Sequence, residues 1–333
     1  MRAWSLIAFL LIGAGLKGQH DVVEGPTVPA ATDSTYRLPM PATPEGAYRF
    51  MTYNLRYAGA SDGPNAWDQR FLYLIDQIQR MKPDVLGTQE GLYRQLMDIE
   101  GFVASDSLHR LACSRAGLAP ETQSLAEVYH WVGVGRDSGD SRGEHTAIFY
   151  RRNRFSCLYS ETFWLGKHSQ EPSVAYDAAL PRIATLALLK DLSSGRTLCV
   201  LNTHFDHVGA KARAKAAKQL WAVVQRYQKF GYAVVLMGDL NLVPEEAPIR
   251  FLASHMQEAW ESTQWHYTGS PWGQPIHGTF NAFQYGKPHE RRIDYVFATR
   301  DWTVLKHGII PESTGGLYPS DHFPVLVDLM LGR

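Results

Sequence analysis

Apolar and polar residues alternate along the chain in blocks that predict strands and helices, and one block ends abruptly. The five apolar residues of Ala233–Met237 are followed at once by Gly238, Asp239 and Asn241. A continuous apolar run that stops at a polar turn is typical of a fully buried strand. Asp239 and Asn241 are two positions apart, so they face the same side of an extended segment. An Asx turn explains the same pattern, and this block alone therefore does not establish a functional site.

The beginning of the expected folded region alternates between strand and helix patterns. Apolar residues recur at helical spacing from Phe71 to Met81; Asn65, with Asp68 three residues later, suits a helix start, and Pro83 stops the helix. The flanking elements predicted are a strand at Tyr48–Asn54, a buried strand at Asp84–Gln89 and a second helix at Leu92–Ile99. This order predicts that the two strands are parallel or neighbours in one sheet.

The middle of the chain is richer in strand patterns. A helix is predicted from Ala210, and four cations lie on its first turns, at Lys211, Arg213, Lys215 and Lys218. A solvated helix face explains these cations; the alternative is that some of them meet an anionic substrate near His204. The strands predicted from apolar and aromatic runs are Val128–Val134, Thr146–Arg151, Phe155–Leu165, Arg182–Leu189 and Leu198–Thr203.

The last third of the chain adds two strands and a long loop. Pro244 and the two acids after it suit the start of a helix. Six of the twelve residues of Tyr267–Gly278 are Gly, Pro or Trp, and this segment is predicted to be a surface loop. Strands are predicted at Arg292–Thr299 and Phe323–Leu329.

The N-terminal residues predict export. Arg2 precedes an uncharged apolar run at Ala3–Leu16, which is too short to span a bilayer. We expect a Sec-type signal peptide at residues 1–19 and a secreted or periplasmic protein; an N-terminal anchor that stays uncut is the alternative. Residues 20–46 hold five prolines among Thr, Ala and Ser, which predicts an extended linker. One folded domain is expected at residues 47–333.

The charge balance argues against a general nucleic-acid binder. The 333 residues hold 33 Lys and Arg against 33 Asp and Glu, and signal removal would leave a net charge of −2. This balance gives no electrostatic footprint for non-specific nucleic-acid binding. We expect a monomer without a stable membrane span. Cys113, Cys157 and Cys199 are too few and too scattered for a zinc site and allow at most one disulfide.

Polar residues repeatedly mark the ends of the predicted strands. Five of them follow apolar runs (Asn54, Glu90, His204, Asp239 and Asn241), and Asp294 and His322 lie near strand starts. Strand ends in a layered sheet fold meet at one rim, so these side chains are expected to converge. The oxygen ligands of Glu90, Asp321 and Asn54 suit Mg²⁺ or Mn²⁺. A metal, acid–base histidines and amide donors together suit phosphoester hydrolysis.

Seven short motifs, in order, resemble those of the endonuclease/exonuclease/phosphatase superfamily over about Arg49–Leu329. They are TYNLR with Asn54, TQE with Glu90, E-x₅-YR at Glu144–Arg151, NTHFDH with His204, GDLN with Asp239 and Asn241, RIDYVF with Asp294, and SDHFP with Asp321 and His322. Each motif is weak by itself, and their joint order makes the resemblance specific. It implies a DNase I-like four-layer α/β sandwich, in which two mixed β-sheets lie face to face with helices outside.

The resemblance also implies a role for each motif residue. Glu90 would be the principal ligand of Mg²⁺ or Mn²⁺, helped by Asn54 and Asp321. Asp294 would orient His322, which would act as a base or contact the phosphate. The remaining residues would act on water and phosphate: Asp239 on the attacking water, Asn241 and His204 on phosphate oxygens, and Glu144 as a support for His204.

Other short stretches of the sequence look like those of secreted bacterial members of this superfamily, whose substrates are mostly undefined. Asp206 and His207 lie beside His204 and either contact substrate or cap the loop. The candidate supporting or substrate-binding residues are Glu144, Asp206, Arg182, Arg213 and Arg292.

The cations near the motifs suit one or two phosphates rather than a duplex. The aromatic residues Trp272, Phe280, Phe283 and Tyr285 either line a substrate wall or pack their loop. We therefore expect a metal-dependent phosphoesterase for a small, sugar-linked or lipid-linked phosphoester. The alternatives are a secreted nuclease and, more remotely, a non-catalytic binding protein of the same fold.

Overall fold

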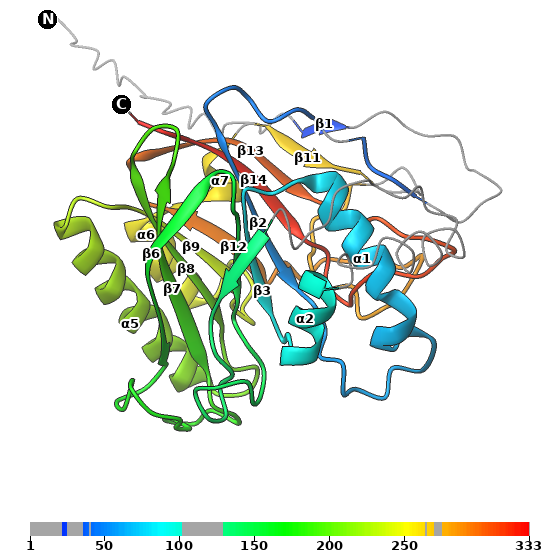
Figure 1. Cartoon of the computed structure of the whole chain (residues 1–333). Coiled ribbons are helices and arrows are strands. Elements are labelled where there is room, and N and C mark those ends of the chain that lie inside the picture. Colours follow the sequence, from blue (N-terminus) through cyan, green and yellow to red (C-terminus); the bar gives the residue numbers. More distant parts are fainter. Residues whose placement is uncertain are drawn as a thin grey trace, which may run out of the picture.

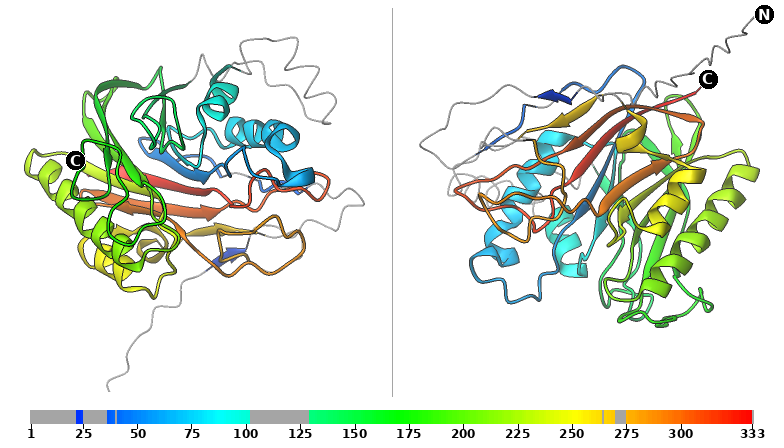
Figure 2. Two further views of the ribbon diagram at one scale, coloured as in Figure 1. Left: turned by 90° about the horizontal axis from the view of Figure 1, so that it is seen from below. Right: turned by 180° about the vertical axis from the view of Figure 1, so that it is seen from behind.

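The computed structural model describes residues 22–24, 36–39, 41–101, 129–263, 265–269 and 275–332. The expected signal peptide at 1–19, most of the expected linker at 20–46 and Cys113 lie outside the described residues. The described residues form two mixed β-sheets with helices on their outer faces (Figures 1 and 2). Within this part of the chain, no helix combines the length and the apolar character that a membrane crossing requires.

The first sheet has eight strands in the order β1-β11-β13-β14-β2-β3-β5-β4. Parallel pairs join β1 to β11, β11 to β13 and β2 to β3, and the other pairs are antiparallel. The strands are β1 (Val22–Glu24), β2 (Tyr48–Asn54), β3 (Val85–Gln89), β4 (Tyr129–Val132), β5 (Ile148–Arg151), β11 (His266–Thr268), β13 (Trp302–Ile309) and β14 (Val325–Leu331).

The second sheet has six strands in the order β10-β12-β9-β8-β7-β6. Only β8 and β9 are parallel neighbours in it. Its strands are β6 (Phe155–Trp164), β7 (Ile183–Asp191), β8 (Thr197–His204), β9 (Ala233–Asp239), β10 (Gln257–Glu258) and β12 (Asp294–Ala298).

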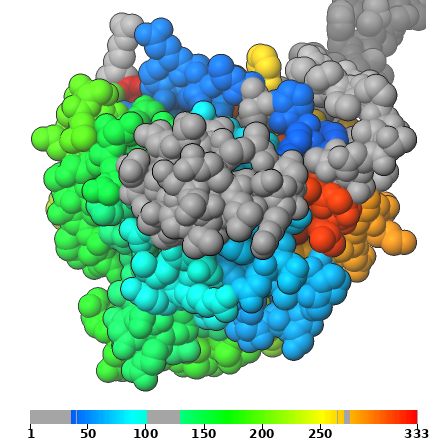
Figure 3. All heavy atoms as spheres, turned by 45° about the vertical axis from the view of Figure 1, so that its right-hand side comes forward, coloured from blue at the N-terminus to red at the C-terminus, as the bar shows by residue number. Residues whose placement is uncertain are grey.

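Apolar side chains divide into three cores that define four layers. One core lies between the sheets and contains Phe50 of β2 and Val235 of β9. A second packs the first sheet against α1 (Trp67–Met81) and α2 (Tyr93–Gly101), which lie together on the surface shown in Figure 3. A third packs the second sheet against α5 (Ala210–Lys229) and α6 (Ala247–His255). The predicted four-layer sandwich is therefore confirmed.

Several local predictions need correction. A 3₁₀ turn, η1 (Gly63–Asn65), occupies the predicted cap, and α1 starts at Trp67 after the N-cap residue Ala66. The helix expected after Pro244 begins at Ala247, with Glu246 as N-cap residue. β11 and the buried Ile276 interrupt the loop predicted at 267–278, and α7 (Ala259–Ser262), β10 and β13 were not predicted.

Residues that precede the predicted start of the domain at residue 47 already pack against it. Tyr36 and Leu38 are buried in the core under α1. The backbones of Tyr36 and Ser313 exchange hydrogen bonds of 2.9 and 3.1 Å, and the Leu38 amide donates to Glu312. These residues correct the expected linker, because part of residues 20–46 is packed rather than extended away from the domain.

The strand registers bring the polar strand ends to one rim. Asn54 of β2 is paired with Gln89 of β3, and His204 of β8 with Asp239 of β9. Gly238 lets these last two strands approach, since a Cβ there would lie 2.0 Å from the Thr203 carbonyl oxygen and its φ is +148°. We call this edge the catalytic rim.

Candidate active site

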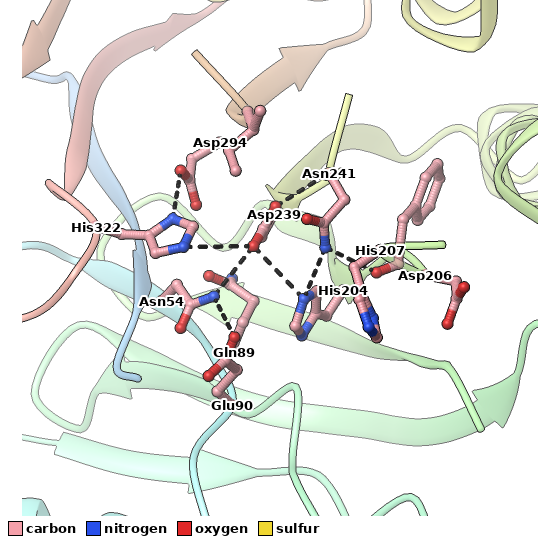
Figure 4. Close-up of polar contacts among 12 residues, drawn as sticks. Asn54, Gln89, Glu90, His204, Asp206, His207, Asp239, Asn241, Asp294 and His322 are labelled. Atoms are coloured by element: carbon pink, nitrogen blue, oxygen red, sulfur yellow. Dashed lines mark hydrogen bonds and ion pairs between the residues drawn. The ribbon is translucent and has the colours of Figure 1, made fainter. Parts of the chain in front are cut away.

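Polar side chains from both sheets meet at the catalytic rim (Figure 4). The second sheet supplies His204 and Asp239 at the ends of β8 and β9, and Asp294 lies opposite Asp239 at the start of β12. The first sheet supplies Asn54 at the end of β2 and Glu90 directly after β3. His322 comes from the segment before β14. The structure therefore brings these six predicted residues together.

Asn54 holds two carboxylates side by side. Its Nδ2 donates hydrogen bonds of 3.0 Å to both Glu90 Oε1 and Asp239 Oδ2, while its Oδ1 accepts from the Arg56 amide at 2.9 Å. The Tyr57 amide donates to the other Glu90 oxygen at 3.0 Å. Asn54 thus fixes the positions of Glu90 and Asp239, and its amide nitrogen rather than its amide oxygen faces them.

Three residues of this region have an unusual backbone conformation. Glu90, Asn241 and Arg56 have φ values of 61°, 50° and 53°. A positive φ is uncommon outside glycine and costs free energy that surrounding contacts must offset. The hydrogen bonds of Glu90 with Asn54 and Tyr57 provide such contacts, and they aim its carboxylate at Asp239.

Asp239 is buried and has no lysine or arginine partner among the described residues. Its Oδ1 accepts a hydrogen bond of 2.9 Å from the Asn241 amide, and its Oδ2 lies 3.5 Å from His204 Nε2 and 3.9 Å from His322 Nε2. Burial, followed by repulsion from Asp294, raises the pKa of Asp239 to about 7. Without a bound cation, this carboxyl group therefore changes protonation state near neutral pH.

Asp294 and His322 form a buried pair. His322 Nδ1 lies 2.9 Å from Asp294 Oδ2, and the Thr279 hydroxyl accepts from the Asp294 amide at 3.1 Å. Burial alone would lower the pKa of His322, but Asp294, together with Asp239 and Asp321, raises it to about 10. His322 is therefore a cation at neutral pH, with its Nε2–H directed toward Asp239.

A side-chain nitrogen of another residue faces each ring nitrogen of His204. Arg182 Nη1 lies 3.2 Å from Nδ1, and Asn241 Nδ2 lies 3.1 Å from Nε2. Burial, then the charges of Arg182 and Arg136, lowers the pKa of His204 well below its ordinary value. The ring is therefore neutral. Because an arginine only donates, Nδ1 accepts and the proton is on Nε2, facing Asp239.

A carboxylate on the opposite side supports this histidine. Glu144 Oε2 lies 3.9 Å from His204 Nδ1, and Arg136 binds both Glu144 oxygens at 2.8 Å. Glu144 thus lies where the sequence motif placed it. Arg136 was not identified from the sequence; its position in a polar loop carries no recognisable signal, and only the fold brings it to Glu144.

Asp206 caps its loop. It accepts from the Val208, Gly209 and Ala179 amides, and these hydrogen bonds outweigh burial and hold its pKa at about 2. Arg182 Nε also donates to it at 3.2 Å. Asp206 is buried, so of the two alternatives the structure supports the capping role.

Arg182 and Arg213, two cations predicted to contact substrate, form hydrogen bonds with the loop that contains Asp206 instead. Arg182 is buried, and its Nη2 lies 2.9 Å from Nδ1 of the exposed His207. Arg213 donates to the Asp206 carbonyl at 3.0 Å. Lys211, Lys215 and Lys218 are exposed on α5, in agreement with a solvated face.

Arg292 corrects a prediction, because its contacts lie away from the catalytic rim. Its Nη1 is 3.0 Å from Glu258, and its guanidinium packs over the Trp260 and Tyr295 rings. It is buried and anchors α7 to the second sheet. The motif that contains Arg292 does not indicate an ion pair with Glu258, because Glu258 lies more than thirty positions earlier in the chain.

The predicted aromatic wall is only partly present at the rim. The Phe280 ring lies 5.1 Å from the His322 ring, and Arg291 lies over the Phe280 ring. Phe283 and Tyr285 pack against the core instead. Trp272 lies outside the described residues.

The donor chemistry at the rim fits a hard divalent cation. Ligand atoms of Glu90, His204 and Asp239 lie within 4.8 Å of one another, as do those of Asp239, Asp294 and His322. Neither Glu90 nor Asp239 forms an ion pair with a lysine or arginine in the described part of the chain. Asp239 is buried and Glu90 is half-buried, so leaving both carboxylates without such partners is costly, and a cation such as Mg²⁺ or Mn²⁺ would offset the cost.

Asp321 does not join either group of potential ligands among the described residues. Its Oδ2 lies 3.7 Å from Arg56 Nη1, and its Oδ1 is 3.4 Å from the Ser320 hydroxyl. Burial raises its pKa, and Glu90 adds to the effect. The structure thus places Asp321 near Glu90 but facing Arg56.

Comparison with known proteins gives the context of this site. The chain matches the profile of the Endonuclease/Exonuclease/phosphatase family over residues 51–322. None of the curated proteins compared with it gives a significant match.

Similar solved structures cover nearly the whole domain. An endonuclease/exonuclease/phosphatase from Bacteroides vulgatus is 31% identical, with a TM-score of 0.71 over 86% of this chain and 99% of that chain. A mannosyl-6-phosphatase from Bacteroides thetaiotaomicron VPI-5482 is 29% identical, with a TM-score of 0.69 over 85% of this chain and 99% of that chain. The catalytic domain of human Nocturnin, 19% identical with a TM-score of 0.58 over 87% and 96%, shares the fold.

Proposed function

This chain belongs to the endonuclease/exonuclease/phosphatase family, and from that premise we propose that it is a metal-dependent phosphoesterase for a small phosphorylated molecule, foremost a sugar phosphate. The observation that carries the proposal is the position of Asp239. Its carboxylate faces Glu90 and neutral His204 on one side and the cationic His322 on the other. An acid, a base and a cation site around one point suit attack of water on a phosphoester.

In this proposal, each residue has a role that follows from its protonation state. Glu90 would hold a divalent ion, which supplies charge stabilisation to the phosphoryl group when bound. Asp239 orients the attacking water and accepts its proton. His322 donates its Nε2–H to a phosphoryl oxygen, and Asp294 keeps that ring oriented and protonated.

Neutral His204 and Asn241 complete the phosphate site. The His204 Nε2–H and the Asn241 amide lie side by side, 3.1 Å apart, next to Asp239. Both groups can donate hydrogen bonds to an anionic oxygen without adding a charge of their own. Arg182, Arg136 and Glu144 keep His204 in place from behind.

Two observations favour a small substrate over nucleic acid. Arg182, Arg213 and Arg292 are each engaged by groups of the protein, which leaves few cations to neutralise a line of phosphates. One similar protein, at 29% identity, is a mannosyl-6-phosphatase. A phosphorylated sugar therefore leads the candidates.

The test is a substrate panel with purified protein in Mg²⁺, in Mn²⁺ and in EDTA. Mannose 6-phosphate, p-nitrophenyl phosphate, bis-p-nitrophenyl phosphate, plasmid DNA and RNA are compared at one ionic strength. We expect metal-dependent turnover of small esters and little cleavage of nucleic acid. Rapid plasmid nicking that falls steeply with salt, without turnover of small esters, would favour a nuclease; no turnover of any substrate would favour a binding protein.

We also propose that the protein is exported, as Arg2 and the apolar run at Ala3–Leu16 suggest. Mass spectrometry of the native protein then finds an N-terminus shortly after this run. An intact Met1 on protein from the cytoplasm would contradict the proposal.

A further inference from the structure

A second concave surface lies at the opposite ends of the strands. It encloses about 460 Å³ and is lined by residues 41–43, by Asp84 and by five cations: Arg49, Arg80, Lys82, Arg151 and Arg154. Arg49 lies at the start of β2, whereas Asn54 of the catalytic rim ends the same strand. A strand of this length spans on the order of 20 Å, so the two surfaces are separate. We call this surface the basic pocket.

Three of the five cations are neutralised by carboxylates. Arg49 binds both oxygens of Asp328, at 2.8 and 2.9 Å. Arg80 pairs with Glu312 and, at 2.9 Å, with Asp76. These ion pairs, buried for Arg49 and partly exposed for Arg80, hold both guanidinium groups in fixed positions.

Arg154 is the third neutralised cation. Its Nη1 donates to Asp84 at 2.6 Å, and its Nε lies 3.8 Å from Asp191. Asp84 is the one carboxylate in the lining of the basic pocket. Its Oδ2 also accepts from the Arg49 amide at 2.8 Å, and the residue is buried beneath the cations. Asp84 therefore holds the Arg154 side chain and the Arg49 backbone in place from beneath the pocket.

The other two cations have no such partner. Neither Lys82 nor Arg151 forms an ion pair within the described part of the chain. Lys82 is exposed and caps α1 in a left-handed conformation with φ of 49°, where glycine is the usual residue. Arg151 ends β5, half-buried, and its Nε is buried without a hydrogen-bond partner. Lys82 and Arg151 are thus the two cations of this lining that no carboxylate of the described residues binds directly.

We propose that the basic pocket binds a tetrahedral oxyanion, the phosphate or sulfate group of a ligand distinct from the substrate. A phosphate monoester carries about −1.5 to −2 charges at neutral pH, and Lys82 and Arg151 are the lining cations that have no carboxylate partner of their own among the described residues. Arg80 and Arg154 have more N–H groups than their recorded bonds use, and both are partly exposed. The pocket volume lies in the range of small-ligand sites.

The basic pocket contains none of the groups that the catalytic rim would use for hydrolysis. Its lining has no histidine, and its one carboxylate is bonded to Arg154 and the Arg49 backbone. A bound anion is therefore retained rather than hydrolysed. This inference does not depend on the substrate of the catalytic rim.

The test is calorimetric titration of the whole protein with inorganic phosphate and, separately, with sulfate, in EDTA and at constant ionic strength. The variant Lys82→Gln/Arg151→Gln removes both free charges, and Lys82→Arg/Arg151→Lys keeps them. Arg226→Gln/Lys229→Gln removes two exposed cations of α5 as a matched control. His322→Ala removes a catalytic-rim contribution to anion binding.

We expect at least one of the two anions to bind about tenfold more weakly to the Gln/Gln variant, since charge-assisted hydrogen bonds are lost. The charge-preserving variant, the α5 control and His322→Ala should bind this anion as tightly as the wild type does. Turnover of p-nitrophenyl phosphate should be unchanged in the Gln/Gln variant. Equal affinity of the wild-type and Gln/Gln proteins, or a binding component lost only in His322→Ala, would overturn the proposal.

Discussion

The basic pocket and the catalytic rim differ in which groups bind their carboxylates. At the basic pocket, the carboxylates of Asp328, Asp84 and Glu312 are each bound by an arginine. At the catalytic rim, Glu90 and Asp239 have no arginine or lysine ion pair within the described residues, and amides and histidines surround them. β2 and β3 run from one end to the other, since Arg49 and Asp84 lie at their starts and Asn54 and Glu90 at their ends.

This difference separates charges that hold the fold from charges that are available for chemistry. A buried carboxylate paired with arginine is already satisfied, and removing one partner leaves an uncompensated charge. A buried carboxylate without an arginine or lysine partner keeps its affinity for a cation or a proton, as the pKa of about 7 for Asp239 shows. The following predictions separate the two kinds, from the largest expected effect to the smallest.

Glu90→Gln should give the largest effect, on activity alone. The change keeps the shape and the hydrogen bond from Tyr57 but removes the charge that would hold the ion. Turnover of p-nitrophenyl phosphate should fall at least about a thousandfold, since several kcal/mol of charge stabilisation is lost. The urea unfolding midpoint should change little. Full activity of this variant would remove Glu90 from the mechanism.

Arg49→Met should have the reverse effect, on stability alone. It leaves the carboxylate of Asp328 buried and unpaired, which should lower the free energy of unfolding by about 3–5 kcal/mol. The double variant Arg49→Met/Asp328→Leu should recover much of the loss, and turnover per folded molecule should stay close to wild type. A large loss of turnover in the double variant would contradict the separation of the two ends.

His322→Ala and Asp294→Asn should lower turnover to a similar extent, on the order of a hundredfold, the usual scale for a positioned acid–base group. Asp294 acts through the 2.9 Å contact that raises the pKa of His322. Comparison of kcat for the two variants and the double variant measures this coupling. A neutral Asp294→Asn beside an inactive His322→Ala would show that the pair does not work as a unit.

His307 should affect only the pH dependence of stability. It lies in the middle of β13, and burial, followed by Arg292 and His266, lowers its pKa well below the ordinary value. The unfolded chain therefore binds a proton below about pH 6.5 that the folded chain does not, and stability is lost as the pH falls. By pH 5.5 this residue should account for about 1.4 kcal/mol.

Urea unfolding of wild-type protein and His307→Gln at pH 7.5 and 5.5 measures this term. The variant should lose less stability on acidification, with turnover at pH 7.5 unchanged. An equal loss in both proteins would show that His307 is not the titrating group.

Sequence patterns predicted many of the strands and helices because these elements depend on local periodicity, whereas the four-layer arrangement was implied by the family resemblance. Buried strands such as β9 appear as continuous apolar runs, and α1 repeats its apolar face every three to four residues. Strand ends such as Asn54, Glu90 and Asp239 could be assigned to one rim because strand ends in a layered sheet fold converge. Short elements at the sheet edge, such as β11, carry too few residues for a periodic signal.

The remaining features depend on contacts between distant parts of the chain. Arg292 was expected at the substrate, but its charge is taken by Glu258 from another segment. Arg136 reaches Glu144 through a loop without periodicity. Tyr36 packs under α1 although it lies in a Pro-rich stretch, because its ring meets apolar residues far along the chain. Pairing of this kind leaves no trace in local composition.

The most direct test of the central claim is Mn²⁺ binding followed by electron paramagnetic resonance on metal-free protein. The unpaired carboxylates of the catalytic rim should bind Mn²⁺ in the wild type, and Glu90→Gln should lose that binding. Asp84→Asn, which alters a carboxylate already bound by Arg154, should retain it. Equal Mn²⁺ binding by the wild type and Glu90→Gln, or loss of binding in Asp84→Asn alone, would contradict the account.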